Sequence, residues 1–231
     1  DGLIDLQRER WLGVMEADGV DWLVEFSLKI EFQQPEVLLK AQDFAGYASL
    51  SPDGNQLVWV EWQQPFMPWD ASQLWWASLD NRGAIQEKVL IAGSITASEK
   101  RISVFQPFWL STGELAVAED STGWWNLMVI GPDISPANGL AWRRPWPMAS
   151  ESAMPQWVYG MRTTAASGCD LVTATCDRGR WSLKVLARSG QVLDVNQPFD
   201  DLVGVDAIQG RVLAIARNSV TGTGLLEIDL T

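Results

Sequence analysis

Hydrophobic residues in this chain occur in short runs that are separated by turn-forming residues. Runs of this length, rich in Val, Leu, Ile and Ala and bounded by Gly, Asp and Ser, are typical of buried β-strands. No segment keeps the i, i+3, i+4, i+7 spacing of apolar residues through three helical turns. The pattern predicts an all-β fold, and five runs recur at residues 10–15, 56–61, 114–119, 170–175 and 211–216.

A second strand, centred on a leucine, follows each of these runs. The leucines lie 51, 53, 56 and 42 residues apart, at Leu23, Leu74, Leu127, Leu183 and Leu225. A repeat of about 50 residues with four short strands is typical of a propeller blade, whereas a β-sandwich shows no such recurring phase. We therefore predict a β-propeller of about five four-stranded blades, at residues 1–42, 43–95, 96–140, 150–196 and 197–231.

Composition and charge exclude several classes of partner and site. The 231 residues carry a net charge of −12, which argues against nucleic acid and anionic membranes as partners, because those require clustered Lys and Arg. No apolar run reaches the roughly 20 residues of a membrane span, and the start does not resemble a signal peptide. Only Cys169 and Cys176 are present, and we expect two buried small hydrophobic residues in a cytoplasmic protein, with no cofactor and no metal.

The chain contains no histidine, and this decides what catalysis it can support. Ser-His-Asp and Cys-His arrangements need an imidazole to accept the proton of the nucleophile. No Gly-x-Ser-x-Gly sequence is present either, and Gly222-Thr223-Gly224 continues as a strand rather than opening a phosphate-binding helix. We therefore predict that this chain holds no catalytic residue of its own.

Fourteen tryptophans are unusual for this length, and two interpretations remain open. Large flat rings fill the wedge between twisted sheets, so the tryptophans would pack between blades. Alternatively, the pairs Trp59/Trp62, Trp75/Trp76 and Trp124/Trp125 would form an aromatic surface for peptides or sugars.

Several strings go beyond architecture. Residues 51–54 (SPDG), 57–62 (LVWVEW), 65–70 (PFMPWD) and 73–75 (QLW) occur in that order, followed by 104–109 (VFQPFW) and 120–127 (DSTGWWNL). Together they resemble the propeller of bacterial acylaminoacyl-peptidase and dipeptidyl-aminopeptidase-like members of the prolyl oligopeptidase family. Residues 1–5 and 156–161 match more loosely. Two departures are the lack of the family's Asp-His at residues 63–66 and the loss of the SPDG turn at 110–113.

The resemblance implies a larger ring of seven or eight blades over a C-terminal α/β-hydrolase domain that carries the Ser, Asp and His. The chain would be the middle of that propeller, and the hydrolase domain would lie outside it. The implied function is a non-catalytic, gating and substrate-selecting propeller of a serine oligopeptidase or aminopeptidase, with short peptides and the hydrolase domain as partners. A free-standing propeller that serves as a protein-interaction platform, or a lectin-like binder, are the alternatives.

The loop at residues 61–70 is the segment expected to lie near a ligand. It combines carboxylates, tryptophans, a methionine and prolines, which suits a rigid loop that recognises an amino terminus beside an apolar side chain. The same loop would otherwise be a connection at a blade edge, with its tryptophans buried between blades. The candidate substrate-binding residues are Glu61, Trp62, Met67, Trp69, Asp70, Trp124 and Trp125.

Overall fold

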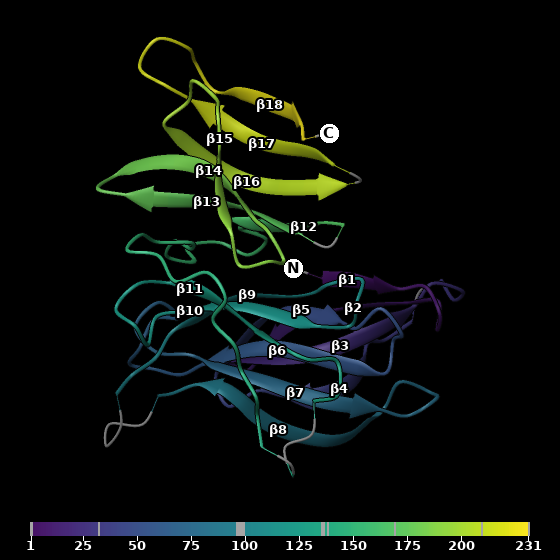
Figure 1. The fold of residues 1–231 in the computed structure, drawn as a ribbon. Helices are drawn as coiled ribbons and strands as arrows, with labels where there is room; N and C mark the ends of the chain where they lie inside the picture. The colour runs from purple at the N-terminus through teal and green to yellow at the C-terminus, as the bar shows by residue number, and fades with distance from the viewer. Residues whose placement is uncertain are drawn as a thin grey trace.

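The computed structural model consists of five antiparallel sheets, and it describes residues 2–230 apart from 32, 96–99, 135, 136, 138, 169 and 209. Figure 1 shows the fourth and fifth sheets, green to yellow, stacked at one end of the molecule. This confirms the predicted all-β propeller class with five units. Within the described part of the chain, no helix has the length and hydropathy needed to cross a membrane.

Each sheet is a meander, so strands that follow one another in sequence are hydrogen-bonded neighbours. The first sheet contains β1 (Gly2–Asp5), β2 (Arg10–Ala17), β3 (Val20–Ser27) and β4 (Glu36–Lys40), and the second contains β5 (Phe44–Leu50), β6 (Gln56–Trp62), β7 (Gln73–Leu79) and β8 (Ile85–Gly93). The third contains β9 (Val104–Trp109), β10 (Leu115–Glu119) and β11 (Asn126–Ile130). The fourth contains β12 (Thr164–Ser167), β13 (Asp170–Asp177), β14 (Arg180–Leu186) and β15 (Val192–Val195), and the fifth β16 (Asp201–Ile208), β17 (Arg211–Arg217) and β18 (Gly224–Asp229).

The third and fifth sheets show three strands each in the described residues, where four were predicted. In the third sheet, Arg143 pairs with Val129 of β11 through a single antiparallel bridge. This bridge stands where the outermost strand of a blade would lie. The repeat is therefore retained here in a reduced form.

The hydrophobic core lies between the sheets. Four clusters of buried side chains join the first sheet to the second, the second to the third, the third to the fourth and the fourth to the fifth. Trp59 and Phe105 are fully buried in this way, as inter-blade packing of aromatic rings predicts. In the described residues, none of these clusters joins the fifth sheet to the first.

Four of the five aligned leucines occupy equivalent buried positions. Leu23, Leu74, Leu127 and Leu183 are all at most 1% exposed, but Leu225 is 72% exposed. In the fifth sheet the equivalent residue is Leu226, which pairs with the buried Ala214 and packs against the core. The predicted alignment was one residue out of register there, and a shift of one residue moves a side chain to the opposite face of a strand.

The connections that carry most of the candidate residues lie together at one end of the sheets. Because strands alternate in direction along a meander, the β6–β7 loop and the β4–β5 and β8–β9 connections emerge on the same face. Their contacts agree, since Gln63 Nε2 donates to Gln42 Oε1 at 2.6 Å and Ser103 Oγ donates to the Pro68 carbonyl at 2.7 Å. We call this end of the molecule the loop face.

Candidate functional site

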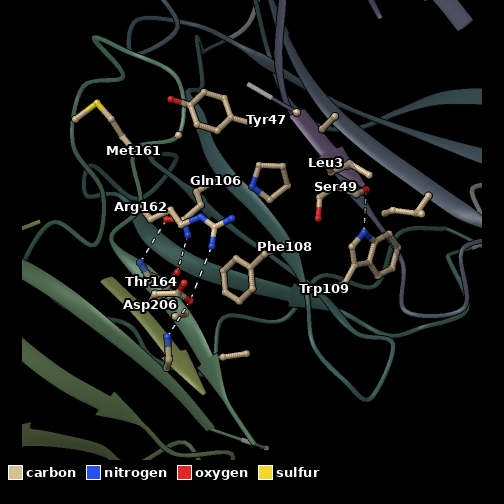
Figure 2. Close-up of a pocket in the computed structure, with 18 of the residues that line it drawn as sticks. Leu3, Tyr47, Ser49, Gln106, Phe108, Trp109, Met161, Arg162, Thr164 and Asp206 are labelled. Atoms are coloured by element: carbon tan, nitrogen blue, oxygen red, sulfur yellow. Dashed lines mark hydrogen bonds and ion pairs between the residues drawn. The ribbon is translucent and has the colours of Figure 1, made fainter. Parts of the chain in front are cut away.

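A cavity of about 460 Å³ is lined by the first strand of all five sheets (Figure 2). Leu3 of β1, Ser49 of β5, Phe108 of β9, Thr164 of β12 and Asp206 of β16 each lie on its wall. Because every sheet contributes its first strand, the cavity lies at the axis about which the sheets are arranged. We call it the axial cavity.

Irregularities in the first strands shape this cavity. Tyr47, Gln106 and Gly204 have positive φ values of 56°, 49° and 63°, and each lies at a register shift of its strand. A β-bulge of this kind bends the strand and redirects a side chain away from the regular alternation. The repeated bulge therefore turns the Tyr47 and Gln106 side chains toward positions that a regular strand would not supply.

The side-chain amide of Gln106 ties the third sheet to the fourth. Its Oε1 accepts hydrogen bonds from the backbone N–H groups of Thr163 at 2.9 Å and Thr164 at 3.3 Å, and its Nε2 donates to the Thr164 carbonyl at 2.6 Å. All three residues are buried. One amide thereby satisfies three backbone groups that would otherwise be unpaired at the cavity wall.

The described wall of the axial cavity carries a single cation and a single anion. These are Arg162 and Asp206, whose side chains approach to 3.9 Å and are both more than half exposed (Figure 2). An exposed pair at this separation is worth at most about 1 kcal/mol. The wall is otherwise neutral, which suits a ligand such as a peptide backbone better than a strongly charged group.

A segment between the third and fourth sheets reaches over one edge of the axial cavity. This strap, residues 157–161, contributes Gly160 and Met161 to the cavity wall. The Tyr159 hydroxyl donates to the Ala45 carbonyl at 3.0 Å, and the Tyr47 hydroxyl donates to the Val158 carbonyl at 3.1 Å. The strap is thus fastened to β5 from both directions.

The two tyrosines remain hydrogen-bond donors over the whole physiological range. Burial raises the pKa of Tyr47 to about 12. Burial and the neighbouring carboxylate of Asp21, 3.4 Å from the hydroxyl, raise the pKa of Tyr159 further. Burial also raises the pKa of Asp21 itself, although the Ala45 N–H donates to it at 2.9 Å.

Gly46 allows the strap to approach β5, and its substitution should loosen the strap. A Cβ atom at Gly46 would lie 2.5 Å from Cε1 of Tyr159. We expect Gly46→Ala to displace the ring and to lower the free energy of unfolding, measured in urea, by about 1–3 kcal/mol, which is the cost of overpacking. Gly222→Ala, where a Cβ would meet nothing within 4 Å, is the control. Unchanged stability in Gly46→Ala would show that packing of the Tyr159 ring on β5 does not hold the strap.

The structure places the predicted loop residues in three different surroundings. Glu61 is buried within the second sheet, where its Oε1 accepts from Trp59 Nε1 at 2.7 Å and Lys88 Nζ at 2.8 Å. Trp62 is half-buried and stacks on Phe44, with ring centroids 5.7 Å apart. These contacts tie both residues into the sheets, and their role in substrate binding stays a prediction.

The tip of the same loop is accessible on the loop face. Met67 is exposed, and Asp70 is exposed and accepts a hydrogen bond from the Met67 N–H at 3.1 Å. The half-buried Trp69 ring lies 4.4 Å from that of Trp157 in the strap, and Trp157 is 72% exposed. The structure therefore brings Trp69 next to the strap and leaves Met67 and Asp70 exposed in the same loop, and substrate binding by all three stays a prediction.

Trp124 and Trp125 lie apart from that group, in the β10–β11 connection of the third sheet. Trp124 is exposed and lines a small hollow with Pro147 and Met148. Trp125 is half-buried, and its backbone N–H donates to Glu151 Oε2 at 2.7 Å. They do not line the axial cavity, and their role in binding also stays a prediction.

The sequence singled out residues 156–161 only as a loose match to the family, and it predicted neither their role as a strap nor the cavity pair of Arg162 and Asp206. One sequence signal pointed to an additional segment here, because the spacing between the third and fourth repeats is the longest of the four. The linker that results contains Trp157, Val158 and Tyr159, which are exposed in the structure. Cys176 is a free, partly exposed thiol rather than a fully buried residue, and Cys169 lies outside the described residues. No group of three potential metal ligands occurs in the residues that the structure describes.

Five consecutive meanders around an axial cavity define a segment of a β-propeller. Solved structures share this fold, and several of them are peptidases. The chain is similar to a puromycin hydrolase, with a TM-score of 0.87, 24% identity and 99% of the chain covered. It is also similar to a puromycin-hydrolyzing peptidase of Mycobacterium tuberculosis (0.86, 21%, 100%) and to prolyl oligopeptidase B of Galerina marginata (0.73, 11%, 100%).

These likenesses confirm the predicted resemblance at the level of the fold. The chain spans 35%, 36% and 31% of the lengths of those three structures, respectively. No family model matches the sequence, and no curated protein matches it either.

Proposed function

We propose that this chain is the non-catalytic, substrate-selecting part of a serine peptidase that acts on short peptides. The observation that carries the proposal is the axial cavity, which five first strands line and the strap partly covers. A cavity of about 460 Å³ admits a short extended segment and excludes a folded domain. The names of the similar structures, hydrolases and peptidases, support the same reaction class.

Exposed apolar side chains on the last sheet support the proposal that the propeller continues. Along β17 the side chains alternate, so that Ala214 is buried against the fourth sheet while Leu213 and Ile215 face outward. Ile215 pairs with the exposed Leu225 of β18, which extends the same outward apolar face. A further blade would cover this face as each earlier blade covers its predecessor.

The proposed partner outside this chain is an α/β-hydrolase domain that supplies the serine, aspartate and histidine. A propeller above such a site restricts entry and excludes bulk water, which strengthens the electrostatic stabilisation of the reaction. We also propose a cytoplasmic location, which the free thiol of Cys176 supports because reducing compartments maintain thiols.

The gene that encodes this chain provides the first test. We expect Gly-x-Ser-x-Gly within about 150 residues after Thr231, followed by an Asp and a His in that order. A reading frame that lacks these residues would contradict the peptidase and favour the interaction platform.

A cavity substitution in the full-length protein tests selection itself. Ser49 lines the axial cavity and is half-buried, so Ser49→Trp narrows the cavity without breaking its backbone contact to Trp109 Nε1. We expect kcat/KM for a ten-residue peptide to fall at least about tenfold more than kcat/KM for a dipeptide substrate. Ser78→Trp, at a half-buried position of the second sheet that does not line the cavity, is the control. Equal losses for both substrates would show that peptides do not enter through the cavity.

A further inference from the structure

A second groove, of about 500 Å³, lies where the first and second sheets meet, and it shares no lining residue with the axial cavity. Its wall comes from the end of β4, the β4–β5 connection and the strands β6, β7 and β8. Two lysines, Lys40 and Lys88, line it together with the side-chain amides of Gln42, Gln63 and Gln73. We propose that this Lys40–Lys88 groove binds a small ligand through an oxyanion, a carboxylate or a phosphate group.

Lys88 is held in place before any ligand arrives. Its Nζ lies 4.2 Å from the ring centroid of Trp75 and 5.2 Å from that of Trp59, and it donates to Glu61 Oε1 at 2.8 Å. The Lys88 side chain is nevertheless 31% exposed, whereas that of Glu61 is only 4% exposed. Aromatic faces and a buried carboxylate therefore position the ammonium group, while part of it still faces the groove.

Lys40, the last residue of β4 in the first sheet, supplies a second positive charge to the groove. Its Nζ lies 4.8 Å from the ring centroid of Trp22, and it forms no ion pair with any residue that the structure describes. Among the described residues that line the groove there are thus two cations and one carboxylate, in a protein whose net charge is −12. A local excess of positive charge on an acidic protein attracts a compact anion rather than a polyanion.

The amide side chains provide neutral donors beside the two lysines. Gln63 Nε2 donates to Gln42 Oε1 at 2.6 Å, which fixes the orientation of the Gln42 amide and leaves its two N–H groups as donors. Amide and ammonium donors together match the acceptor-only oxygens of a carboxylate or phosphate. A ligand without negative charge would leave Lys40 without its counter-charge.

Two substitutions with opposite expected effects test this proposal on the purified chain. The probes are inorganic phosphate and trialanine with either a free or an amidated C-terminus, titrated by calorimetry at low salt. We expect Lys40→Gln to weaken binding of the anionic probes about tenfold, because one charged contact is lost. Glu61→Gln should strengthen it several-fold, because removal of the internal carboxylate raises the positive charge of the groove.

The control is Lys29→Gln, which removes an exposed lysine on the opposite end of the first sheet, where Lys29 pairs with Glu9. Binding of phosphate and of free-carboxylate trialanine, but not of the amidated peptide, supports an oxyanion site. Binding of only one of them identifies phosphate or peptide carboxylate as the source. The proposal is overturned if no probe binds, if Lys40→Gln binds as the unsubstituted chain does, or if Glu61→Gln binds more weakly. The outcome does not depend on the proposed peptidase function.

Discussion

Replacing Asp5 by alanine is expected to lower the free energy of unfolding by about 3 kcal/mol, because the buried Arg10 is then paired with Glu25 alone and Arg8 loses its carboxylate partner. Asp5 and Arg10 are both buried, and Asp5 Oδ2 accepts from Arg10 Nε at 2.9 Å and from Arg8 Nη1 at 3.0 Å. The removal of one partner from a buried ion pair costs far more than the pair contributes relative to apolar residues of the same size.

The same arginines connect the first sheet to turns of the second. Arg8 donates to the Gly54 carbonyl at 2.8 Å and to the Asp80 carbonyl at 3.2 Å, and Arg10 donates to the Gly83 carbonyl at 3.2 Å. Loss of Asp5 therefore removes the carboxylate that holds both arginines where they bridge the two sheets, although Glu25 still pairs with Arg10. In a domain of this size the expected loss corresponds to a fall in Tm of about 10 °C.

Thermal and urea unfolding of Asp5→Ala measure this effect. Asp194→Ala is the matched control, since it removes an exposed carboxylate that pairs with Lys184 on the fourth sheet. Such a pair is worth about 0–1 kcal/mol. If Asp5→Ala costs no more than Asp194→Ala, solvent reaches the arginines and the network does not contribute to stability.

Acid unfolding should report the same network. Burial alone would raise the pKa of Asp5, but the hydrogen bonds from Arg10 and Arg8 outweigh it and lower the pKa below its ordinary value. A carboxylate whose pKa is lower in the folded state stabilises the protein fully above its unfolded pKa. This stabilisation is lost as the pH falls through the folded pKa, so the contribution of Asp5 disappears only in acid below about pH 4.

The repeat made the architecture predictable from the sequence. Leu23, Leu74, Leu127 and Leu183 all mark the same buried strand position, because each blade must bury one face against the next. The assignment was wrong at Leu225, because either of two adjacent leucines, Leu225 and Leu226, could occupy the buried position. Only the pairing of Ala214 with Leu226 in the structure decides the register. Local sequence gives no information on that choice.

The candidate binding surfaces were harder to predict, since they depend on contacts between distant segments. Glu61 is a candidate ligand-binding residue in the sequence because its carboxylate begins a loop rich in tryptophan and proline. In the structure its side chain is buried in its own sheet, where Trp59 and Lys88 donate hydrogen bonds to it. Tyr159 acts on β5 across more than a hundred residues of sequence, through contacts that no local pattern encodes. The axial cavity likewise exists only when all five first strands converge.

Gln106 offers the second large effect, because a single side chain joins two blades at the wall of the axial cavity. Gln106→Ala removes the partner of the Thr163 N–H, the Thr164 N–H and the Thr164 carbonyl, all from buried residues. Each buried backbone group left unpaired costs about 1–3 kcal/mol, and water entering from the cavity recovers part of it. We expect Gln106→Ala to lower the free energy of unfolding by about 2–4 kcal/mol.

The positive φ of 49° at Gln106 allows the hydrogen bonds to be separated from backbone strain. Gln106→Gly also removes the amide, but glycine adopts this left-handed conformation without the penalty of about 1 kcal/mol that alanine carries. Gln106→Gly should therefore be more stable than Gln106→Ala by about that amount and still less stable than the unsubstituted chain. Urea unfolding of the unsubstituted chain, Gln106→Ala and Gln106→Gly measures the contribution of the amide hydrogen bonds and that of the backbone strain. Gln42→Ala, which removes an exposed amide, is the control. If Gln106→Gly matches the unsubstituted chain, backbone conformation rather than the amide joins the third and fourth sheets.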